Sequence, residues 1–361
     1  MKAGIIGFPQ VGKTTLFKIL TKAHLDMMKF SGSKTESHVG VATVPDPRLD
    51  ELSKIFNPKK TSHATVEYLD VAGLVKGESK DATYLGNLRN VDALVHVVRV
   101  FADESISHVE GSIDPKRDIA NVELELLVSD LSIVEKRLDR LEKDIKKQKS
   151  AVLEKELELL KRCKLCLEEE KPLRGLELDS DENKILRGFM FLSEKPILHV
   201  LNLSDGDSNK IDQIISAFQL GAISSQVNVG VTAVCGKVEA ELAELSGEDA
   251  ELFLADYGLK ESGLDRLIRV TYQLLGLISF FTVGDDECRA WTIQQGTTAL
   301  KAAGVIHSDI ERCFIRAEVV PCDKLLELKS LTAARDKGLL RMEGKGYLVQ
   351  DGDVINFRHS G

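Results

Sequence analysis

Residues 7–14, GFPQVGKT, constrain this chain more than any other stretch. The apolar run KAGIIG precedes them and the helical pattern TTLFKILTKA follows, so the expected order is strand, glycine-rich loop and helix. Gly7 and Gly12 let the backbone bend and turn its N–H groups inward, toward a phosphate. Lys13 supplies positive charge for the β and γ phosphates, and the Thr14 hydroxyl suits Mg²⁺. The predicted nucleotide contacts in this loop are Gly7, Phe8, Pro9, Gln10, Val11, Gly12, Lys13, Thr14 and Thr15.

The composition is that of a soluble globular chain. It has 361 residues, of which 43% are hydrophobic and 29% charged, enough for two or three domains. No apolar run approaches the length of a membrane span and no signal peptide opens the sequence, so we expect a cytoplasmic protein without a membrane partner. The net charge of −9 argues against a wholly basic nucleic-acid coat.

Two of the six cysteines, Cys163 and Cys166, form a single CxxC. No second pair and no histidine pair follows at zinc-finger spacing. We therefore interpret them as two residues on one helical turn rather than a metal or redox site. Free cysteines fit a reducing compartment.

Six largely apolar runs are predicted strands: residues 2–7, 40–44, 64–73, 93–100, 195–203 and 227–236. Nearly continuous apolar strands are typical of a sheet covered on both faces. Helical segments separate several of them, which predicts an α/β doubly wound domain.

The alternation breaks between about residues 118 and 192, where apolar residues follow a 3-4 spacing with charged flanks. The first run is Leu131, Val134, Leu138, Leu141, Ile145 and Val152, and the second is Leu153, Leu157, Leu160 and Leu167. The register shifts near residues 149–151, which predicts two helices in a projecting hairpin. A solvated structural hairpin and a partner-binding arm remain equally open.

A third section starts near Ser279. It is predicted to contain a strand, an acidic turn, a second strand and then a helix capped near Thr297 or Thr298. Later, KGYLVQDGDVINFR is predicted to be a strand pair turning at Asp351 and Gly352. The predicted division is a nucleotide-binding domain over residues 1–278, with the helical insertion, and a small α+β domain over residues 279–361.

Two further elements suit a nucleotide site. Asp70 ends an apolar strand and Gly73 follows, a spacing that places a carboxylate near Mg²⁺ and an N–H near the γ-phosphate. Residue 74 is leucine, which cannot orient water by hydrogen bonding. LNLSD, residues 201–205, ends another strand, where bases are recognised in such folds. Asn202 and Asp205 are therefore candidate base contacts, with an ordinary Asn/Ser/Asp turn as the alternative.

Leu203 stands where GTPases typically place lysine. The loop of Val234, Cys235, Gly236 and Lys237 follows the next strand and is a further candidate base contact, which adds Leu203, Cys235 and Gly236 to the predicted base site.

Together these residues resemble the YchF/Obg-like ATPase family, over essentially the whole chain. The markers are GFPQVGKTTLF, VPDPRL (44–49), DVAGLVKGESK (70–80), LGN (85–87), KVEAELAEL (237–245), RAWTI (289–293), FIRAEV (314–319) and VQDGDV (349–354). The resemblance implies a Ras-like P-loop domain, an inserted coiled-coil hairpin and a C-terminal β-grasp module called TGS. It also implies ATP hydrolysis, some GTP binding and association with ribosomes.

The resemblance also implies residue roles. Leu74 matches an apolar residue that replaces a catalytic glutamine, and His108 falls where a histidine is implicated in catalysis. Asn202 and Asp205 match the family's NxxE base motif, with Asp in place of Glu. Gln10 replaces an Asn that binds K⁺ in related enzymes, so K⁺ activation is not expected to carry over. Thr35 is the candidate Mg²⁺-sensing residue in an altered switch segment.

The leading hypothesis is an ATPase in which Mg²⁺ is bound by Thr14, Asp70 and Thr35, and catalysis involves Lys13, Gly73 and His108. A GTPase of the same fold, or a nucleotide-dependent binding module with negligible turnover, remain the alternatives. The expected partners are the ribosome and RNA phosphates, the latter at lysine-rich stretches such as residues 143–149, and the chain is expected to be a monomer.

Overall fold

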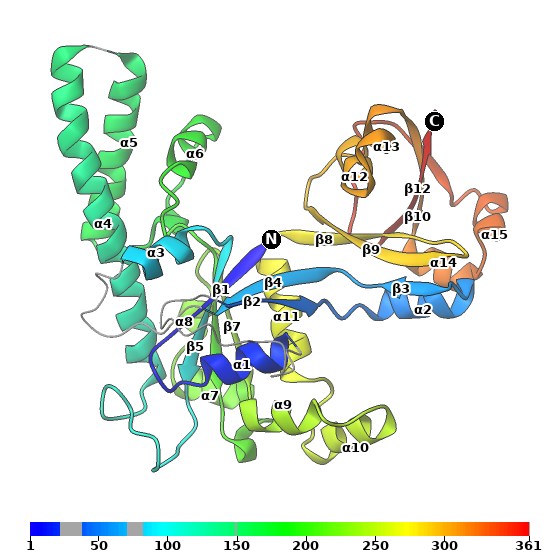
Figure 1. The fold of residues 1–361 in the computed structure, drawn as a ribbon, viewed down its shortest axis with the longest axis horizontal. Helices are drawn as coiled ribbons and strands as arrows, with labels where there is room; N and C mark the ends of the chain where they lie inside the picture. The colour runs from blue at the N-terminus through cyan, green and yellow to red at the C-terminus, as the bar shows by residue number, and fades with distance from the viewer. Residues whose placement is uncertain (22–37, 71–81, 149, 361) are drawn as a thin grey trace. The chain divides into compact units, whose positions relative to one another are not determined.

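The computed structural model describes residues 1–21, 38–70, 82–148 and 150–360, and the chain divides into two compact units. One unit comprises Met1–Val41 and Glu67–Leu274, and the other comprises Ala42–Val66 and Leu275–Gly361. Each unit has its own six-stranded sheet. Figure 1 labels the helices and strands.

The sheet of the first unit has the strand order β2-β4-β1-β5-β6-β7, and β1 pairs in parallel with both β4 and β5. β6 is likewise parallel to β5 and to β7. The strands are β1 Lys2–Ile6, β2 His38–Thr43, β4 Thr65–Asp70, β5 Ala93–Arg99, β6 Ile197–Asn202 and β7 Val229–Val234. The predicted α/β doubly wound fold is confirmed. β2 and β4 lie on one side of β1, and β5, β6 and β7 lie on the other, so the strand order switches sides at β1, where the phosphate loop begins.

Helices cover both faces of this sheet. Its helices are α1 Lys13–Leu20, α3 Ala82–Arg89, α4 Pro115–Lys147, α5 Ala151–Glu168, α6 Ser180–Arg187, α7 Ile211–Ala217, α8 Gly221–Ser224, α9 Gly236–Leu242, α10 Glu248–Asp256 and α11 Gly263–Leu274, with 3-10 turns Leu173–Gly175 (η2) and Asp205–Asp207 (η3). A Cβ on Gly230 of β7 would meet Val270 of α11, so α11 covers that face. On the other face, Val98 and Leu201 pack with Ile119 of α4. Burial on both faces explains why the strands are almost entirely apolar.

The predicted hairpin is formed by α4 and α5, two antiparallel helices drawn in green in Figure 1. Val134, Leu141 and Leu160 are fully buried between them, as the 3-4 spacing predicts. Arg137 of α4 donates to both carboxylate oxygens of Glu156 of α5, at 2.7 and 2.8 Å. Two observations differ from the prediction.

The first difference is that α4 begins at Pro115, whereas the helical section is predicted from about residue 118. Asp114 caps the helix there by accepting the N–H of Arg117 at 3.1 Å. The second is Val152, predicted in the seam but 70% exposed. Val152 lies in the first turn of α5, beyond the end of α4 at Lys147, so no partner helix covers it.

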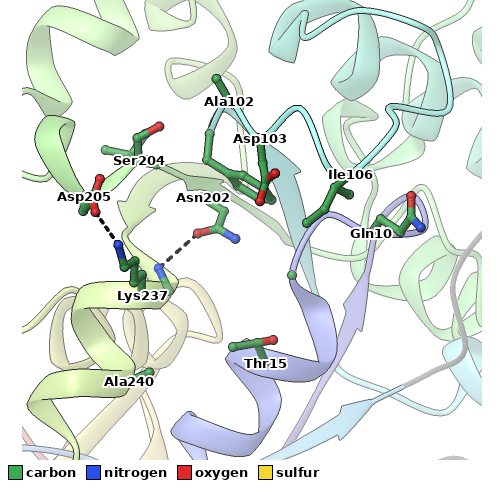
Figure 2. A pocket seen from close by; sticks show the side chains of 14 residues that line it. Gln10, Thr15, Ala102, Asp103, Ile106, Asn202, Ser204, Asp205, Lys237 and Ala240 are labelled. Carbon is green, nitrogen blue, oxygen red and sulfur yellow. Dashed lines mark hydrogen bonds and ion pairs between the residues drawn. The ribbon is translucent and has the colours of Figure 1, made fainter.

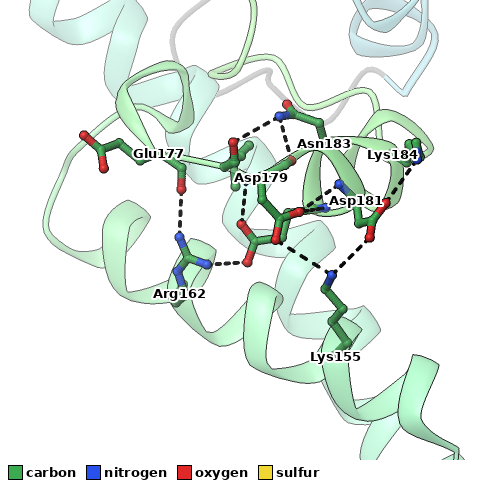
Figure 3. Close-up of polar contacts among 9 residues, drawn as sticks. Lys155, Arg162, Glu177, Asp179, Asp181, Asn183 and Lys184 are labelled. Atoms are coloured by element: carbon green, nitrogen blue, oxygen red, sulfur yellow. Dashed lines mark hydrogen bonds and ion pairs between the residues drawn. The ribbon is translucent and has the colours of Figure 1, made fainter.

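Helix α6 is fixed to the hairpin by polar contacts (Figure 3). Asp179 caps it by accepting the N–H groups of Asp181 and Glu182, and Glu182 completes a capping box. Arg162 of α5 pairs with Glu182 at 2.6 Å. Cys163 and Cys166, the two cysteines of the CxxC, lie about one turn apart in α5. Cys163 is buried in the hairpin's apolar core. Among the described residues, no cluster of histidine, cysteine and acidic side chains has the geometry to hold a metal ion.

A buried carboxylate connects the hairpin to the sheet. Asp130 of α4 is fully buried and accepts hydrogen bonds from the N–H groups of Leu192 and Ser193 at 3.1 and 2.7 Å, and from the Ser193 hydroxyl at 2.8 Å. Arg89, at the end of α3, pairs with the same side chain at 2.9 Å. The chain that returns from the hairpin is therefore held against α4 immediately before β6.

The second unit has a mixed sheet of strand order β11-β10-β12-β8-β9-β3. Its strands are β3 Lys60–Ser62, β8 Leu277–Thr282, β9 Glu287–Gln294, β10 Phe314–Pro321, β11 Arg341–Glu343 and β12 Asp353–His359. Its helices are α2 Pro47–Phe56, α12 Ala299–Ile306, α13 Ser308–Arg312, α14 Cys322–Leu328 and α15 Leu331–Asp336. Phe280, Ala317 and Ile355 form an apolar core with α12, whose N-cap is Thr298, as predicted. A helix packed on such a sheet is the arrangement of a β-grasp domain.

Residues 42–66 belong to this second unit, whereas the sequence prediction placed them in the nucleotide-binding domain. The contacts of Arg48 explain the difference. Its guanidinium pairs with Asp46 and with Asp351, both at 2.8 Å, and lies 5.2 Å from the ring centroid of Phe281. In addition, β3 pairs in parallel with β9. The segment VPDPRL, one of the family markers, is thus held to the C-terminal unit by Arg48, and β3 forms one edge of that unit's sheet.

The predicted strand pair within residues 345–358 is wrong. The second half is β12, but its partners are β10 and β8. The first half runs along the start of α12 instead, where the Tyr347 carbonyl accepts the N–H of Ala299 at 2.7 Å. The turn at Asp351 and Gly352 was predicted correctly, and Gly352 has a φ of +85°. A turn signal fixes where the chain bends but not which strand it pairs with afterwards.

Candidate functional site

The phosphate loop joins β1 to α1 and depends on its glycines. Gly7 and Gly12 have φ values of +141° and +98°, which favour glycine. A Cβ on Gly7 would collide with the carbonyl oxygen of Val97, and one on Gly12 with Nδ2 of Asn202. Both positions therefore need glycine for conformation and for space. Gln10 also has a positive φ, of 62°.

Lys13 lies within the curve of this loop, only 8% exposed. Its Nζ donates to the carbonyl oxygens of Gly7 and Phe8, at 2.9 and 2.6 Å. Burial lowers the pKa of Lys13 to about 8, and the nearby Asp70 carboxylate opposes that shift. An ammonium has three N–H donors, so one remains for a phosphate oxygen.

Asp70 ends β4, beside the phosphate loop. Burial raises the pKa of its carboxyl, while the charge of Lys13 and a hydrogen bond with the Thr14 side chain oppose that shift. A carboxylate and a hydroxyl in contact are two oxygen donors of the kind Mg²⁺ prefers. The other predicted residues of this region, Thr35, Gly73 and Leu74, lie outside the described residues.

A pocket of about 620 Å³ opens beside the loop (Figure 2). It is lined by Gln10, Gly12, Thr15, Phe101, Ala102, Asp103, Ile106, Asn202, Leu203, Ser204, Asp205, Gly236, Lys237 and Ala240. The loops after β1, β5, β6 and β7 thus meet at the carboxyl ends of four parallel strands, where open α/β sheets bind their ligands.

The pocket brings together seven of the residues predicted to contact nucleotide: Gln10, Gly12, Thr15, Asn202, Leu203, Asp205 and Gly236. Cys235 does not line it, because its side chain is buried and only 4% exposed. Phe8 and Val11 also point into the core, at 3% and 2% exposed. These two hold the loop's shape, so any contact they make with nucleotide is through their backbone.

Asn202 connects two of the loops. Its Nδ2 donates to the Val11 carbonyl at 3.0 Å, and its Oδ1 accepts the N–H of Gly236 at 3.1 Å. Both ends of the amide are therefore engaged within the protein, and the side chain is only 8% exposed. Asn202 positions the phosphate loop relative to the β7–α9 loop.

Asp205 and Lys237 lie on one wall of the pocket. Nζ of Lys237 is 2.7 Å from Oδ2 of Asp205, which places the carboxylate of the LNLSD segment in an ion pair (Figure 2).

The opposite wall was not predicted from the sequence. It consists of Phe101 and Ile106, with Ala102 and Asp103, in the loop after β5. Arg99 shapes this loop: its guanidinium donates to the carbonyl oxygens of Phe101, Asp103 and Ile106 at 3.0 to 3.2 Å and covers the Phe101 ring at 4.5 Å. Arg99 is 2% exposed. The available signal in the sequence was an arginine near the end of an otherwise apolar strand, since arginine is rarely buried without partners.

His108 follows in the same loop but does not line the pocket. Its Nδ1 accepts the N–H of Glu110 at 3.1 Å. Its Nε2 is 3.1 Å from Oδ2 of Asp118 in α4, close enough for an ion pair but without the alignment of a hydrogen bond. In this arrangement His108 is directed toward α4.

Two family models match the chain. Residues 2–155 match a family described as "50S ribosome-binding GTPase", and residues 277–360 match the family YchF-GTPase_C, described as a protein of unknown function. The described part of the chain has no helix that combines the length and apolar character of a membrane span.

Relatives match over full length. The chain is 43% identical to the ribosome-binding ATPase YchF of Bacillus subtilis over 99% of both chains, and 41% identical to that of Escherichia coli O157:H7 over 99% of this chain and 98% of the relative. The solved structure of the Schizosaccharomyces pombe YchF GTPase superposes with a TM-score of 0.85 at 30% identity, covering 99% and 97% of the two chains. With its phosphate loop, inserted hairpin and C-terminal unit, this chain belongs to the YchF family.

Proposed function

We propose that this chain binds ATP with Mg²⁺ at residues 7–15, hydrolyses it slowly with stimulation by a partner, and acts on the ribosome. The observation that carries the proposal is the meeting of Lys13, Thr14 and Asp70 where β1 and β4 end. The relatives, which include a ribosome-binding ATPase, support both the nucleotide and the ribosome as partner.

The donor set fits Mg²⁺. The Thr14 hydroxyl and the Asp70 carboxylate are in contact and lie beside a buried lysine, so they would hold the ion next to bound phosphates. Thr35 is the further proposed ligand. When bound, Mg²⁺ supplies charge that stabilises the phosphate oxygens.

Residues of the chain itself would contact the phosphates and position the attacking water. Lys13 donates to two carbonyl oxygens of the loop and so has one N–H to spare for the β and γ phosphates. The N–H of Gly73 is the proposed γ-phosphate contact, and His108 the proposed group that positions water. The apolar Leu74 is the reason we propose slow turnover that a partner accelerates.

We propose that the ribosome contact involves the hairpin and the C-terminal unit, with residues 279–361 acting as a TGS-like module. RNA phosphates are proposed to meet the lysine-rich tip near residues 143–149, of which Lys143, Lys146 and Lys147 are exposed. A cytoplasmic monomer is the state consistent with this role.

The test measures phosphate release from ATP and from GTP over many turnovers, with and without ribosomes. We expect steady release from ATP that ribosomes increase and that Lys13→Ala abolishes. Lys210→Ala, at an exposed lysine of the same unit, is the matched control and should leave the rate unchanged. Absence of release from both nucleotides under all conditions would favour a binding module with negligible turnover.

A GTPase of the same fold is the second candidate. Two observations favour it: the S. pombe relative is a YchF GTPase by name, and Asp205 is the acidic type that pairs with guanine. Tight binding of GTP together with undetectable binding of ATP would establish this candidate instead.

A further inference from the structure

The ion pair of Asp205 and Lys237 occupies a defined place in the pocket. Asp205 comes from the loop after β6 and Lys237 from the first turn of α9, and their side chains meet at 2.7 Å on the wall that also holds Asn202 and Gly236 (Figure 2). Among the described residues that line the pocket, Lys237 alone carries a positive charge. The acidic side chain and this cation therefore line the pocket as an ion pair.

Both oxygens of Asp205 already accept a hydrogen bond. Oδ2 accepts from Lys237, and Oδ1 accepts from the N–H of Gly206 at 3.1 Å. These bonds lower the pKa of the Asp205 carboxyl, and the bond to Asp205 raises the pKa of the Lys237 ammonium. At neutral pH both groups are charged, and the ammonium keeps two further N–H donors.

The two purines differ in what they present to such a pair. Guanine presents donors, its N1–H and its 2-amino group, so it binds a carboxylate that is free to accept. Adenine presents an acceptor at N1 and a C–H at position 2. A donor on the protein therefore suits adenine and opposes guanine, because two donors facing each other leave both unpaired.

We propose that Lys237 is a specificity-determining residue. Its ammonium, held by Asp205, occupies the carboxylate that would otherwise accept guanine N1–H. The same ammonium offers an N–H donor to adenine N1. The proposal rests on the proposed nucleotide site. It accounts for an adenine preference in a chain that has Asp at a position typical of guanine binders. It uses both routes to specificity, a match to one base and a mismatch to the other.

Leu203 and the opposite wall agree with this assignment. Leu203, in place of the lysine typical of GTPases, lines the pocket but is only 3% exposed, so this position supplies no cation to the base. Phe101 and Ile106 supply apolar contacts from the other side of the pocket, which serve either purine. The polar contacts that discriminate adenine from guanine therefore come from Asp205 and Lys237.

The pair can be changed without unfolding the protein. The side chains of Lys237 and Asp205 are 70% and 48% exposed, and exposed ion pairs contribute little to stability. A change in base preference after substitution therefore reports on recognition. The melting temperature of each variant checks that the fold is retained.

The experiment measures Kd for ATP and for GTP by calorimetry in the wild-type chain and in Lys237→Met, which keeps side-chain length and removes the charge. We expect the ratio of GTP to ATP affinity to rise about tenfold or more. Lys210→Met is the matched control, since Lys210 forms a similar pair with Asp207 at 2.8 Å but does not line the pocket. Its ratio should equal that of the wild type.

A double variant, Lys237→Met with Asp205→Ala, tests the mechanism. If the freed carboxylate is what binds guanine, the gain in GTP affinity disappears in the double variant. An unchanged or lowered GTP to ATP ratio in Lys237→Met, with nucleotide binding intact in the wild type, overturns the specificity role and leaves the proposed function standing. A wild-type chain that binds neither nucleotide overturns both.

Discussion

His108 lies against Asp118, with 3.1 Å between Nε2 and Oδ2, at the start of α4. Its other ring nitrogen accepts the N–H of Glu110. Both nitrogens thus face groups of the protein itself, and the side chain is 7% exposed. If His108 acts on the γ-phosphate, the loop after β5 has to release it from Asp118 during the reaction.

For catalysis we predict that His108→Ala lowers kcat for ATP hydrolysis by about 100-fold, within the range lost with a general acid–base group, and leaves the ATP Kd within about twofold. Steady-state kinetics and calorimetry measure the two quantities. His307→Ala is the matched control, because Nδ1 of His307 also accepts the N–H two residues onward, at 3.1 Å, in α13. A kcat in His108→Ala equal to that of the control would show that His108 takes no part in the chemical step.

For pH dependence we predict that ATP affinity falls as pH rises through about 8, the pKa to which burial lowers Lys13. The deprotonated amine has no charge to offer phosphate. Calorimetry across this range measures the effect, and Lys13→Met should remove it. A wild-type affinity that stays constant through this range would contradict the prediction.

Stability should change in the opposite direction. The pKa of Lys13 is about 8 in the folded chain and 10.5 in the unfolded chain, so between these values the unfolded state binds more protons. The free energy of unfolding contributed by Lys13 therefore rises with pH in this range. Comparing urea denaturation of wild type and Lys13→Met at several pH values isolates this contribution.

For the site's architecture we predict that Asn202→Ala weakens ATP and GTP binding by the same factor. Its amide connects Val11 to Gly236, and the loss of two buried hydrogen bonds should cost about 1–3 kcal/mol of unfolding free energy. Calorimetry and urea denaturation measure these effects, with the exposed Asn209→Ala as control. A loss confined to one nucleotide would instead indicate direct contact with the base.

For the hairpin we predict that Asp130→Ala destabilises the first unit by about 3–5 kcal/mol, because Arg89 would keep a largely buried charge without its partner and two N–H groups would lose their acceptor. Thermal denaturation measures the loss. Asp139→Ala, at an exposed position of the same helix, should change stability by less than about 0.5 kcal/mol. Similar losses in both variants would mean that Asp130 does not connect the hairpin to the sheet.

The parts of this structure that depend on residues close together in the sequence could be predicted. The strands of the parallel sheet, the phosphate loop and the hairpin follow from local patterns of apolar residues and glycine. The pocket wall at Phe101 and the pairing of Asp205 with Lys237 depend on contacts between distant loops, which no local pattern specifies. The same reason explains the error at residues 345–358, where the turn was recognised but the partner strand was not.

The contact between Arg48 and Asp351 joins residues 303 positions apart within one unit. A ribosome making this chain therefore produces α2 and β3 long before the strands that receive them. Until residue 351 has left the exit tunnel, Arg48 has only Asp46 as its ion-pair partner. Likewise, β3 has no strand to pair with until β9 has emerged. Completion of the C-terminal unit must be among the last folding events, and a chain released early would leave α2 and β3 exposed.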